Sequence, residues 1–210
     1  MRRARRYILR VRPDGTLRVT VPRGGSRREA EAFVVENRRW IEEERQRIDL
    51  EHAPSEWQPG FEILLRGDRV TIRVERRPEG WVVLYGERRV QTRSAASLRP
   101  VIEGDLRRVA RTELIPRLHE LAAQHGLRVR SVTIRNQRSR WGSCARNGTI
   151  ALNFRLVQMP AAVRDYVLVH ELMHLRQQNH SRRFWRLVEA ACPDFRSAER
   201  WLKTAGRALF

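Results

Sequence analysis

The sequence has few cysteines and no long apolar run, and each absence excludes a class of protein. Its 210 residues include two cysteines, Cys144 and Cys192, which are too few for a disulfide framework and fit a reducing compartment. No stretch of about 18 or more apolar residues is present, so a membrane span is not expected. The basic start MRRARRYILRVRPDG lacks an apolar core, so we do not expect a signal peptide. These features predict a cytoplasmic protein with no membrane partner.

Acidic residues are also scarce relative to basic ones. Asp and Glu number 24 against 43 Lys and Arg, a formal charge of +19, and nearly all of the excess is arginine. The guanidinium fork suits phosphate and carboxylate, so anionic partners such as nucleotides, nucleic acid or acidic peptides are compatible with this composition. The alternative is a codon bias that scatters solvated arginines over the surface. Net charge bears on solubility and non-specific binding, so both interpretations stay open.

The most informative stretch is VLVHELMHLRQQNHSRRFW, residues 167–185. Its spacing of His170 and His174 puts both imidazoles on one face of an α-helix, about 6 Å apart along the axis. Both can therefore bind one divalent ion, for which we expect zinc, although imidazole accepts other divalent metals. Glu171 would flank that ion and act as a general base on a water molecule. The alternative is that so short a pattern arose by chance.

The helix that carries this motif is predicted to be buried, because apolar residues lie almost all the way round it. These residues are Val163, Tyr166, Val167, Leu168, Val169, Leu172, Met173 and Leu175. Burying two imidazoles and a carboxylate in such a place is costly unless they are paired or coordinated. A bound dication would offset that cost.

His180 is the expected third ligand, since a catalytic zinc normally takes three protein ligands and one water. Asn179 is expected as a left-handed C-cap and Ser181 as the N-cap of the next helix. His180 would then lie at a tight corner that turns its imidazole back toward the ion. The rival third ligand is Glu189 on the following helix, but proximity and ligand preference favour His180.

Three motifs in the same order resemble those of the YgjP-like metal-dependent hydrolases, which are relatives of the SprT and WLM zinc-peptidase groups. The motifs are RSRWGSC, GTIALN and DYVLVHELMHLRQQNHSRRFW. An N-terminal hairpin ending in VPRG and a terminal PDF…WLK segment also look typical, so the resemblance covers most of the chain. It implies a small zincin-type domain in which His170, His174 and His180 bind zinc and Glu171 activates water.

The sequence leaves the substrate open between a peptide and a nucleotide. The peptidase relatives imply a metallopeptidase, and an edge strand near the cleft could align an extended peptide. Some YgjP-like members are described as UTP pyrophosphatases, and the arginine excess is compatible with a triphosphate. An alternative from another class is a non-enzymatic nucleic-acid-binding module, which leaves the His, Glu, His array unexplained.

The run RSRWGSC and the strand after it supply further candidates for substrate binding. Arg138 or Arg140 could place a guanidinium in the cleft, where it would stabilise developing negative charge, and Asn153 could position substrate. Trp141-Gly142 is expected mainly to pack the sheet against the metal-binding helix. Cys144 has no histidine close in sequence to activate it, and an activated water makes a thiol nucleophile unnecessary.

Hydrophobic periodicity predicts an α+β fold in two parts. Residues 1–95 are expected to form an N-terminal β-rich lobe for support or substrate recognition. For residues 96–210 the family resemblance implies a zincin-like metallohydrolase domain with the HExxH helix packed on a small β-sheet. The expected elements are a hairpin over 7–21, a helix over 26–48, strands over 62–65, 69–75, 81–84 and 88–91, a helix over 100–126 kinked at Pro116, strands over 129–134 and 149–156, and helices over 163–175 and 181–191.

Overall fold

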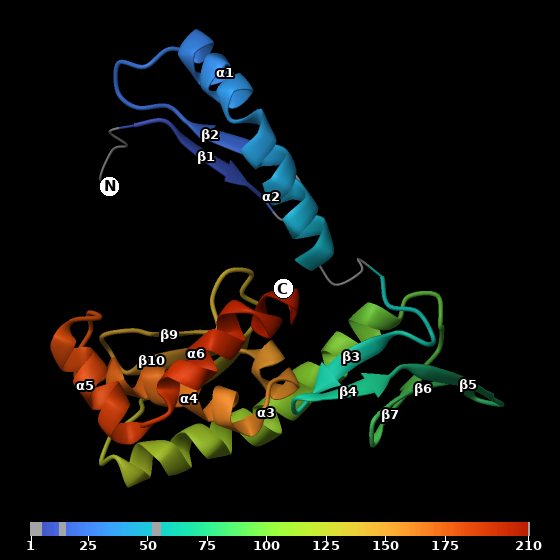
Figure 1. Ribbon diagram of the computed structural model, residues 1–210. Helices are drawn as coiled ribbons and strands as arrows, with labels where there is room; N and C mark the ends of the chain where they lie inside the picture. Colours follow the sequence, from blue (N-terminus) through green and yellow to red (C-terminus); the bar gives the residue numbers. More distant parts are fainter. Residues whose placement is uncertain (1–5, 13–15, 52–55, 210) are drawn as a thin grey trace. The chain divides into compact units, whose positions relative to one another are not determined.

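The computed structural model describes residues 6–12, 16–51 and 56–209 (Figure 1). These residues form six α-helices and several small β-sheets, a mixed α and β architecture. The chain divides into two compact units after Ala53, whereas the sequence suggests a boundary near residue 95. None of the described helices combines the length and the apolar character needed to cross a membrane.

The first unit begins with the predicted β-hairpin. Strand β1 (Ile8–Val11) pairs antiparallel with β2 (Leu17–Thr20). A capping box begins the next helix: Ser26 caps it through its hydroxyl, and the Glu29 carboxylate accepts from the Ser26 N–H at 2.8 Å. The Tyr7 hydroxyl donates to the same carboxylate at 2.6 Å, so the cap also joins the hairpin to the helix.

The single helix expected over 26–48 is wrong, because the structure has two helices. They are α1 (Arg27–Glu36) and α2 (Arg38–Glu51), separated at Asn37. The Asn37 side-chain amide donates to the Phe33 carbonyl at 2.8 Å, beside the backbone N–H that donates to the same oxygen. Asparagine competes in this way with helical hydrogen bonding, which explains a break that apolar periodicity does not predict.

The second unit contains three sheets. They are the hairpin β3 (Glu62–Leu65) with β4 (Asp68–Thr71), the antiparallel meander β5 (Arg73–Arg77), β6 (Gly80–Tyr85) and β7 (Arg88–Thr92), and a sheet of order β8-β10-β9 formed by β8 (Ser131–Arg135), β9 (Gly142–Cys144) and β10 (Thr149–Asn153). Strand β10 runs parallel to β8 and antiparallel to β9. Strand β9 is therefore an edge of its sheet.

Two predicted strands differ from those observed. The strand expected over 69–75 is divided between β4 and β5, because the backbone of Ile72 bonds instead to Gly60 and Phe61. The strand expected over 149–156 ends at Asn153, where the chain enters the 3₁₀ helix η1 (Phe154–Gln158). The Asn153 side chain accepts from the Arg155 N–H at 3.1 Å and so caps this helix.

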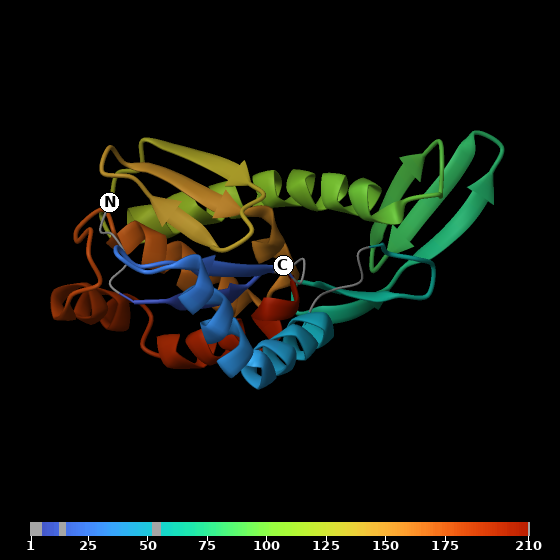
Figure 2. The same ribbon diagram turned by 90° about the horizontal axis from the view of Figure 1, so that it is seen from above.

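The helices of the second unit include one long helix that runs from the β5–β7 meander past the β8-β10-β9 sheet (Figure 2). They are α3 (Leu98–Gln124), α4 (Ala161–Met173), α5 (Arg182–Ala191), α6 (Phe195–Lys203) and the 3₁₀ helix η2 (Ala205–Leu209). Helix α3 continues as one element through Pro116 and ends at Gln124, with His125 as its C-cap and Gly126 following at a φ of +62°. One hydrophobic core joins residues 57–90 to α3 and α4. The strands of residues 62–92 thus share a core with the helix of the metal-binding motif.

A buried carboxylate ties the β5–β7 sheet to α3. The Asp105 side chain is fully buried and accepts from the Tyr85 hydroxyl at 2.5 Å and from Arg88 at 2.8 and 2.9 Å. Arg108 adds a bond at 2.6 Å. Burial alone would raise the pKa of Asp105, but the hydrogen bonds from Arg88 and Tyr85 outweigh it and hold that pKa below its ordinary value.

We expect Asp105→Asn to lower the free energy of unfolding at pH 7 by about 3 kcal/mol, because it leaves the arginines without their buried counter-charge. A lowered carboxyl pKa contributes stability above the unfolded pKa of about 3.9, and this stability is lost as the pH falls through the folded value. The difference between wild type and variant should therefore shrink below about pH 4. Urea unfolding of the wild type and the variant, at pH 7 and again below about pH 4, measures this difference in free energy. A difference that does not depend on pH would contradict it.

Candidate metal centre

Helix α4 places the motif in the protein interior, as its apolar pattern predicts. Several different sides of the helix are buried, as Val167, Leu168 and Leu172 show. The Glu171 side chain is buried as well. His170 and His174 lie on one face of the helix, one turn apart, and His174 is the C-cap residue. The motif is therefore held by a helix that packing fixes in place.

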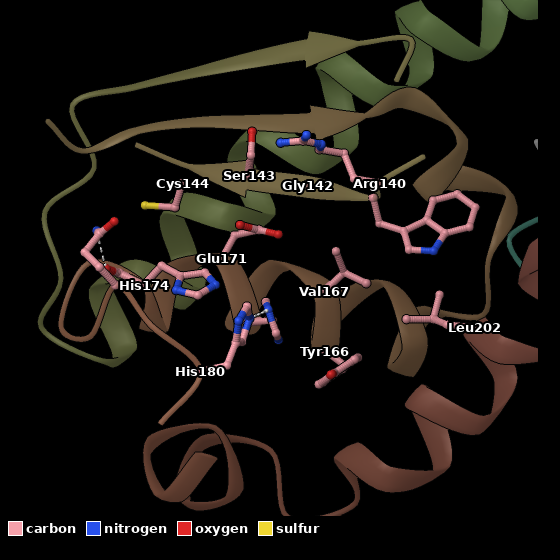
Figure 3. Close-up of a pocket in the computed structure, with 13 residues that line it drawn as sticks. Arg140, Gly142, Ser143, Cys144, Tyr166, Val167, Glu171, His174, His180 and Leu202 are labelled. Atoms are coloured by element: carbon pink, nitrogen blue, oxygen red, sulfur yellow. Dashed lines mark hydrogen bonds between the residues drawn. The ribbon is translucent and has the colours of Figure 1, made fainter. Parts of the chain in front are cut away.

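Three imidazoles converge on one point (Figure 3). Ring nitrogens of His170, His174 and His180 all lie within 4.8 Å of one another, and Nε2 of His170 is 3.0 Å from Nε2 of His180. Neighbouring ligands of a tetrahedral site with metal–nitrogen bonds of about 2.0–2.1 Å stand roughly 3.4 Å apart. Two imidazole lone pairs this close repel each other unless a proton or a cation lies between them. The donor set therefore fits a divalent ion.

Hydrogen bonding fixes which nitrogen of His174 is available. Its Nδ1 lies 3.1 Å from the Gln177 carbonyl oxygen, which can only accept, so Nδ1 carries the proton. The lone pair is then on Nε2, the nitrogen on the other side of the ring. This is the usual way in which a backbone carbonyl orients a metal-binding histidine.

His180 lies in the predicted corner between α4 and α5, but the corner is built differently from the prediction. Ser181 is the N-cap of α5, as expected. Asn179 is not left-handed, since among the described non-glycine residues only Arg66 has positive φ. The end of α4 is closed instead by the Gln178 side chain, which donates to the His174 carbonyl at 2.7 Å.

A buried phenylalanine supports all three imidazoles. Phe184 of α5 has no exposed surface, and its ring centroid lies 4.9, 4.5 and 4.8 Å from those of His170, His174 and His180. It stacks on His174 at an interplanar angle of 25°. Packing on one ring limits the rotation of the three histidines, which reduces the entropy lost when they bind an ion.

Burial sets the protonation of these groups. It lowers the pKa of His170 to about 4, with the neighbouring histidines adding to the effect, and it also lowers the pKa of His174. Both rings are therefore neutral near pH 7 and keep a lone pair for a metal. Burial raises the pKa of Glu171 to about 7, which the Arg140 charge partly opposes. The carboxyl is thus less acidic than an exposed glutamate.

Strand β9 lies directly against Glu171. A Cβ atom built on Gly142 would be 2.6 Å from both Cγ and Oε1 of Glu171, closer than real carbon contacts allow. The absence of a side chain at Gly142 therefore makes room for the carboxylate. The sequence suggests only that Trp141-Gly142 packs the sheet on the helix, and it does not indicate that the contact is with Glu171 itself.

The three histidines and Glu171 line a cavity of about 510 Å³. Its other walls come from β9, from Trp141 before that strand, from Tyr166 and Val167 of α4, and from Leu202 of α6 (Figure 3). The cavity is thus polar at the histidines and apolar toward Trp141 and Leu202. It is large enough for part of a peptide or of another small organic substrate.

Comparison with known proteins agrees with this chemistry. The family described as YgjP-like, metallopeptidase domain, matches residues 5–205. The chain belongs to this YgjP-like family. Membership supports a metal-dependent hydrolase of metallopeptidase type. Among solved structures, the metallopeptidase zymogen of Pyrococcus abyssi abylysin is 29% identical over 35% of this chain and 74% of its own, with a TM-score of 0.33. No curated protein matches.

The two arginines proposed for the cleft of this YgjP-like chain differ in whether they line the cavity. Arg140 lines the cavity, but Arg138 does not. Asn153 does not reach the cavity either, because its side chain is fully buried. Its amide donates to the Gln137 carbonyl at 2.7 Å and to the Arg140 carbonyl at 3.2 Å. Asn153 therefore holds the loop that leads into β9.

The rival ligand Glu189 is separate from the histidines. It lies on α5 beside another cavity, lined also by Trp185 and Phe195, and it does not belong to the described group of residues that could share one ion. Cys144 does line the metal-site cavity. Burial and the Glu171 charge raise the pKa of its thiol to about 11, so the thiol stays protonated at neutral pH and is a poor nucleophile.

Proposed function

We propose that this YgjP-like protein is a zinc-dependent peptidase with a zincin-type site. His170, His174 and His180 would hold the ion, and Glu171 would be the general base. The observation that carries this proposal is the convergence of three imidazoles beside a buried carboxylate in one accessible cavity. Three nitrogen ligands with a free fourth position are typical of catalytic zinc, whereas structural zinc usually has four protein ligands.

When bound, a zinc ion would supply Lewis acidity, which would polarise a carbonyl oxygen and lower the pKa of a water molecule toward about 7. The protein supplies the rest. Glu171 accepts a proton from the attacking water and can return it to the leaving amine, since it is held between α4 and β9. Arg140 adds a positive charge at the cavity wall, where it would stabilise negative charge developing on the substrate.

Strand β9 favours a peptide over a nucleotide. It is an edge strand, and Gly142, Ser143 and Cys144 all line the cavity. An extended peptide can add to such an edge through main-chain hydrogen bonds, which would lay it across the histidines. A triphosphate instead needs several cations, and Arg140 is the one arginine among the residues that line the cavity. This observation argues against the UTP pyrophosphatase alternative.

Metal analysis of purified variants tests the ligand set. We expect about one zinc per chain in the wild type and loss of that zinc in His170→Ala and in His174→Ala. His180→Ala should also weaken zinc binding, whereas Glu189→Ala, the matched control on α5, should leave it unchanged. Elemental analysis after dialysis against a weak chelator measures each case. Full zinc retention in both α4 variants would exclude the proposed site.

A substrate panel tests the reaction class. The zinc-loaded protein should cleave unstructured peptides of the casein type and should leave nucleoside triphosphates intact. His170→Ala, which lacks the ligand, is the control for contaminating proteases. Release of pyrophosphate or phosphate from UTP by the wild type but not by this control would assign the site to the nucleotide reaction instead.

A further inference from the structure

The β5–β7 meander presents one of its two faces outside the hydrophobic core. Successive residues of a strand point to opposite faces. Val83, Tyr85 and Val90 are buried on the inner face, where Asp105 of α3 also bonds to the sheet. The residues between them therefore point outward. The figures show this meander at the end of α3 where that helix begins (Figures 1 and 2).

The register of the strands places four arginines at the corners of the outer face. Arg73 of β5 and Arg89 of β7 are both paired with Leu84 of the central strand. Arg77 is paired with Gly80, and Arg93 follows Thr92, the partner of Trp81, so it lies beside Gly80 on the other side. From the spacing of strands and residues, the four Cα atoms outline a rectangle of about 10 by 13 Å. The arginine trough is defined here as Arg73, Arg77, Arg89 and Arg93 with Val82 and Leu84 between them.

The four arginines are exposed, and they are incompletely neutralised. Within the described part of the chain, Arg73, Arg89 and Arg93 make no side-chain ion pair, and Arg77 pairs with Glu75. Water screens the repulsion among the four guanidinium groups, so holding them together costs little free energy. Together they produce a positive electrostatic potential on this face. A scattered arginine surface would not align its charges in two rows.

The middle of the arginine trough is apolar and hollowed. Val82 and Leu84 are half-buried, although neither belongs to the core that packs beneath the sheet. Two hollows of about 250 and 680 Å³ share Arg77, Glu79, Val82 and Gln91 as lining residues. The trough thus combines four arginines with an apolar floor, and Glu75 and Glu79 line the larger hollow beside them.

We infer that the arginine trough binds a single strand of nucleic acid. Guanidinium groups match phosphate oxygens and can also stack on bases, so a groove of arginines with an apolar floor can hold a single strand without reading its sequence. An acidic peptide would satisfy the charges but would leave the apolar floor of Val82 and Leu84 with little to contact. None of the trough residues lines the metal-site cavity, so this binding does not depend on the proposed peptidase activity.

Fluorescence anisotropy with a labelled mixed-sequence oligodeoxynucleotide of about 12 residues tests the inference on the full-length protein. The trough variant replaces all four arginines by glutamine. The matched control removes the same charge at four other exposed arginines that make no ion pair within the described residues, by Arg111→Gln, Arg128→Gln, Arg130→Gln and Arg146→Gln. Titrations from about 50 to 200 mM salt give both affinity and salt dependence.

We expect the trough variant to bind at least about tenfold more weakly than the control at the lower salt concentration. The slope of log affinity against log salt should become shallower by about 3, since each lost phosphate contact to a single strand removes about 0.7. Circular dichroism confirms that both variants fold. Adding a metal chelator should leave the wild-type affinity unchanged.

Three results would overturn the inference. Equal losses in trough variant and control would show that binding follows net charge alone. Displacement of the oligonucleotide by poly-glutamate at equal charge concentration would assign the trough to acidic polypeptides. Loss of binding on chelation would place the strand at the metal-site cavity.

Discussion

Glu171→Gln is expected to lower peptide turnover by at least about 100-fold while leaving zinc occupancy and folding unchanged. Glutamine keeps the size and shape of the side chain, and it still fits beside Gly142. It removes the basic oxygen that takes the proton from water. Zinc should stay because the proposed ligands are the three histidines, and Glu171 is not one of them. The measurement is the initial rate of peptide cleavage at equal zinc content per chain.

Glu189→Gln provides the matched control for this experiment, since it makes the same chemical change outside the group of histidines. Its turnover should equal that of the wild type. If Glu171→Gln matched the wild type at equal zinc content, Glu171 would not be the base. A purely structural zinc site makes a different prediction: the wild type itself would hydrolyse nothing, and the substitution would change only stability.

The parts of the site that could be predicted from the sequence are those fixed by local geometry. Helical periodicity puts His170 and His174 on one face, and a turn before the next helix puts His180 near them. The same reasoning finds the hairpin of β1 and β2 and the strand β3, where alternation and turn residues agree. In each case the deciding residues are close together in the sequence.

Features that depend on distant partners could not be predicted in this way. Strand β9 is three residues long and has no alternating pattern, so it is a strand only because β10 pairs with it. Asn153 looks like a substrate contact, but hydrogen bonds to the loop before β9 occupy its side chain. The boundary expected near residue 95 follows the change from strands to helices, whereas the core of the second unit includes both.

Gly142 is the clearest case of such a distant contact, and Gly142→Ala is the second substitution expected to have a large effect. Alanine is compatible with the backbone there, because Gly142 is not among the described glycines with positive φ. Its methyl group would lie 2.6 Å from Cγ of Glu171, so the carboxylate must move. We expect turnover to fall by about 10- to 100-fold, the scale of a displacement of about 1 Å in a catalytic group.

Zinc content should not change in Gly142→Ala, since the methyl group contacts the base and not the ligands. Gly104→Ala in α3 is the control, because a methyl group at Gly104 meets no atom within 4 Å. The losses of turnover caused by Gly142→Ala and by Glu171→Gln should not be additive. In the Glu171→Gln background there is no base left to displace, so Gly142→Ala should cause little further loss of turnover. Full additivity would mean that Gly142 acts on the substrate through β9 and not through Glu171.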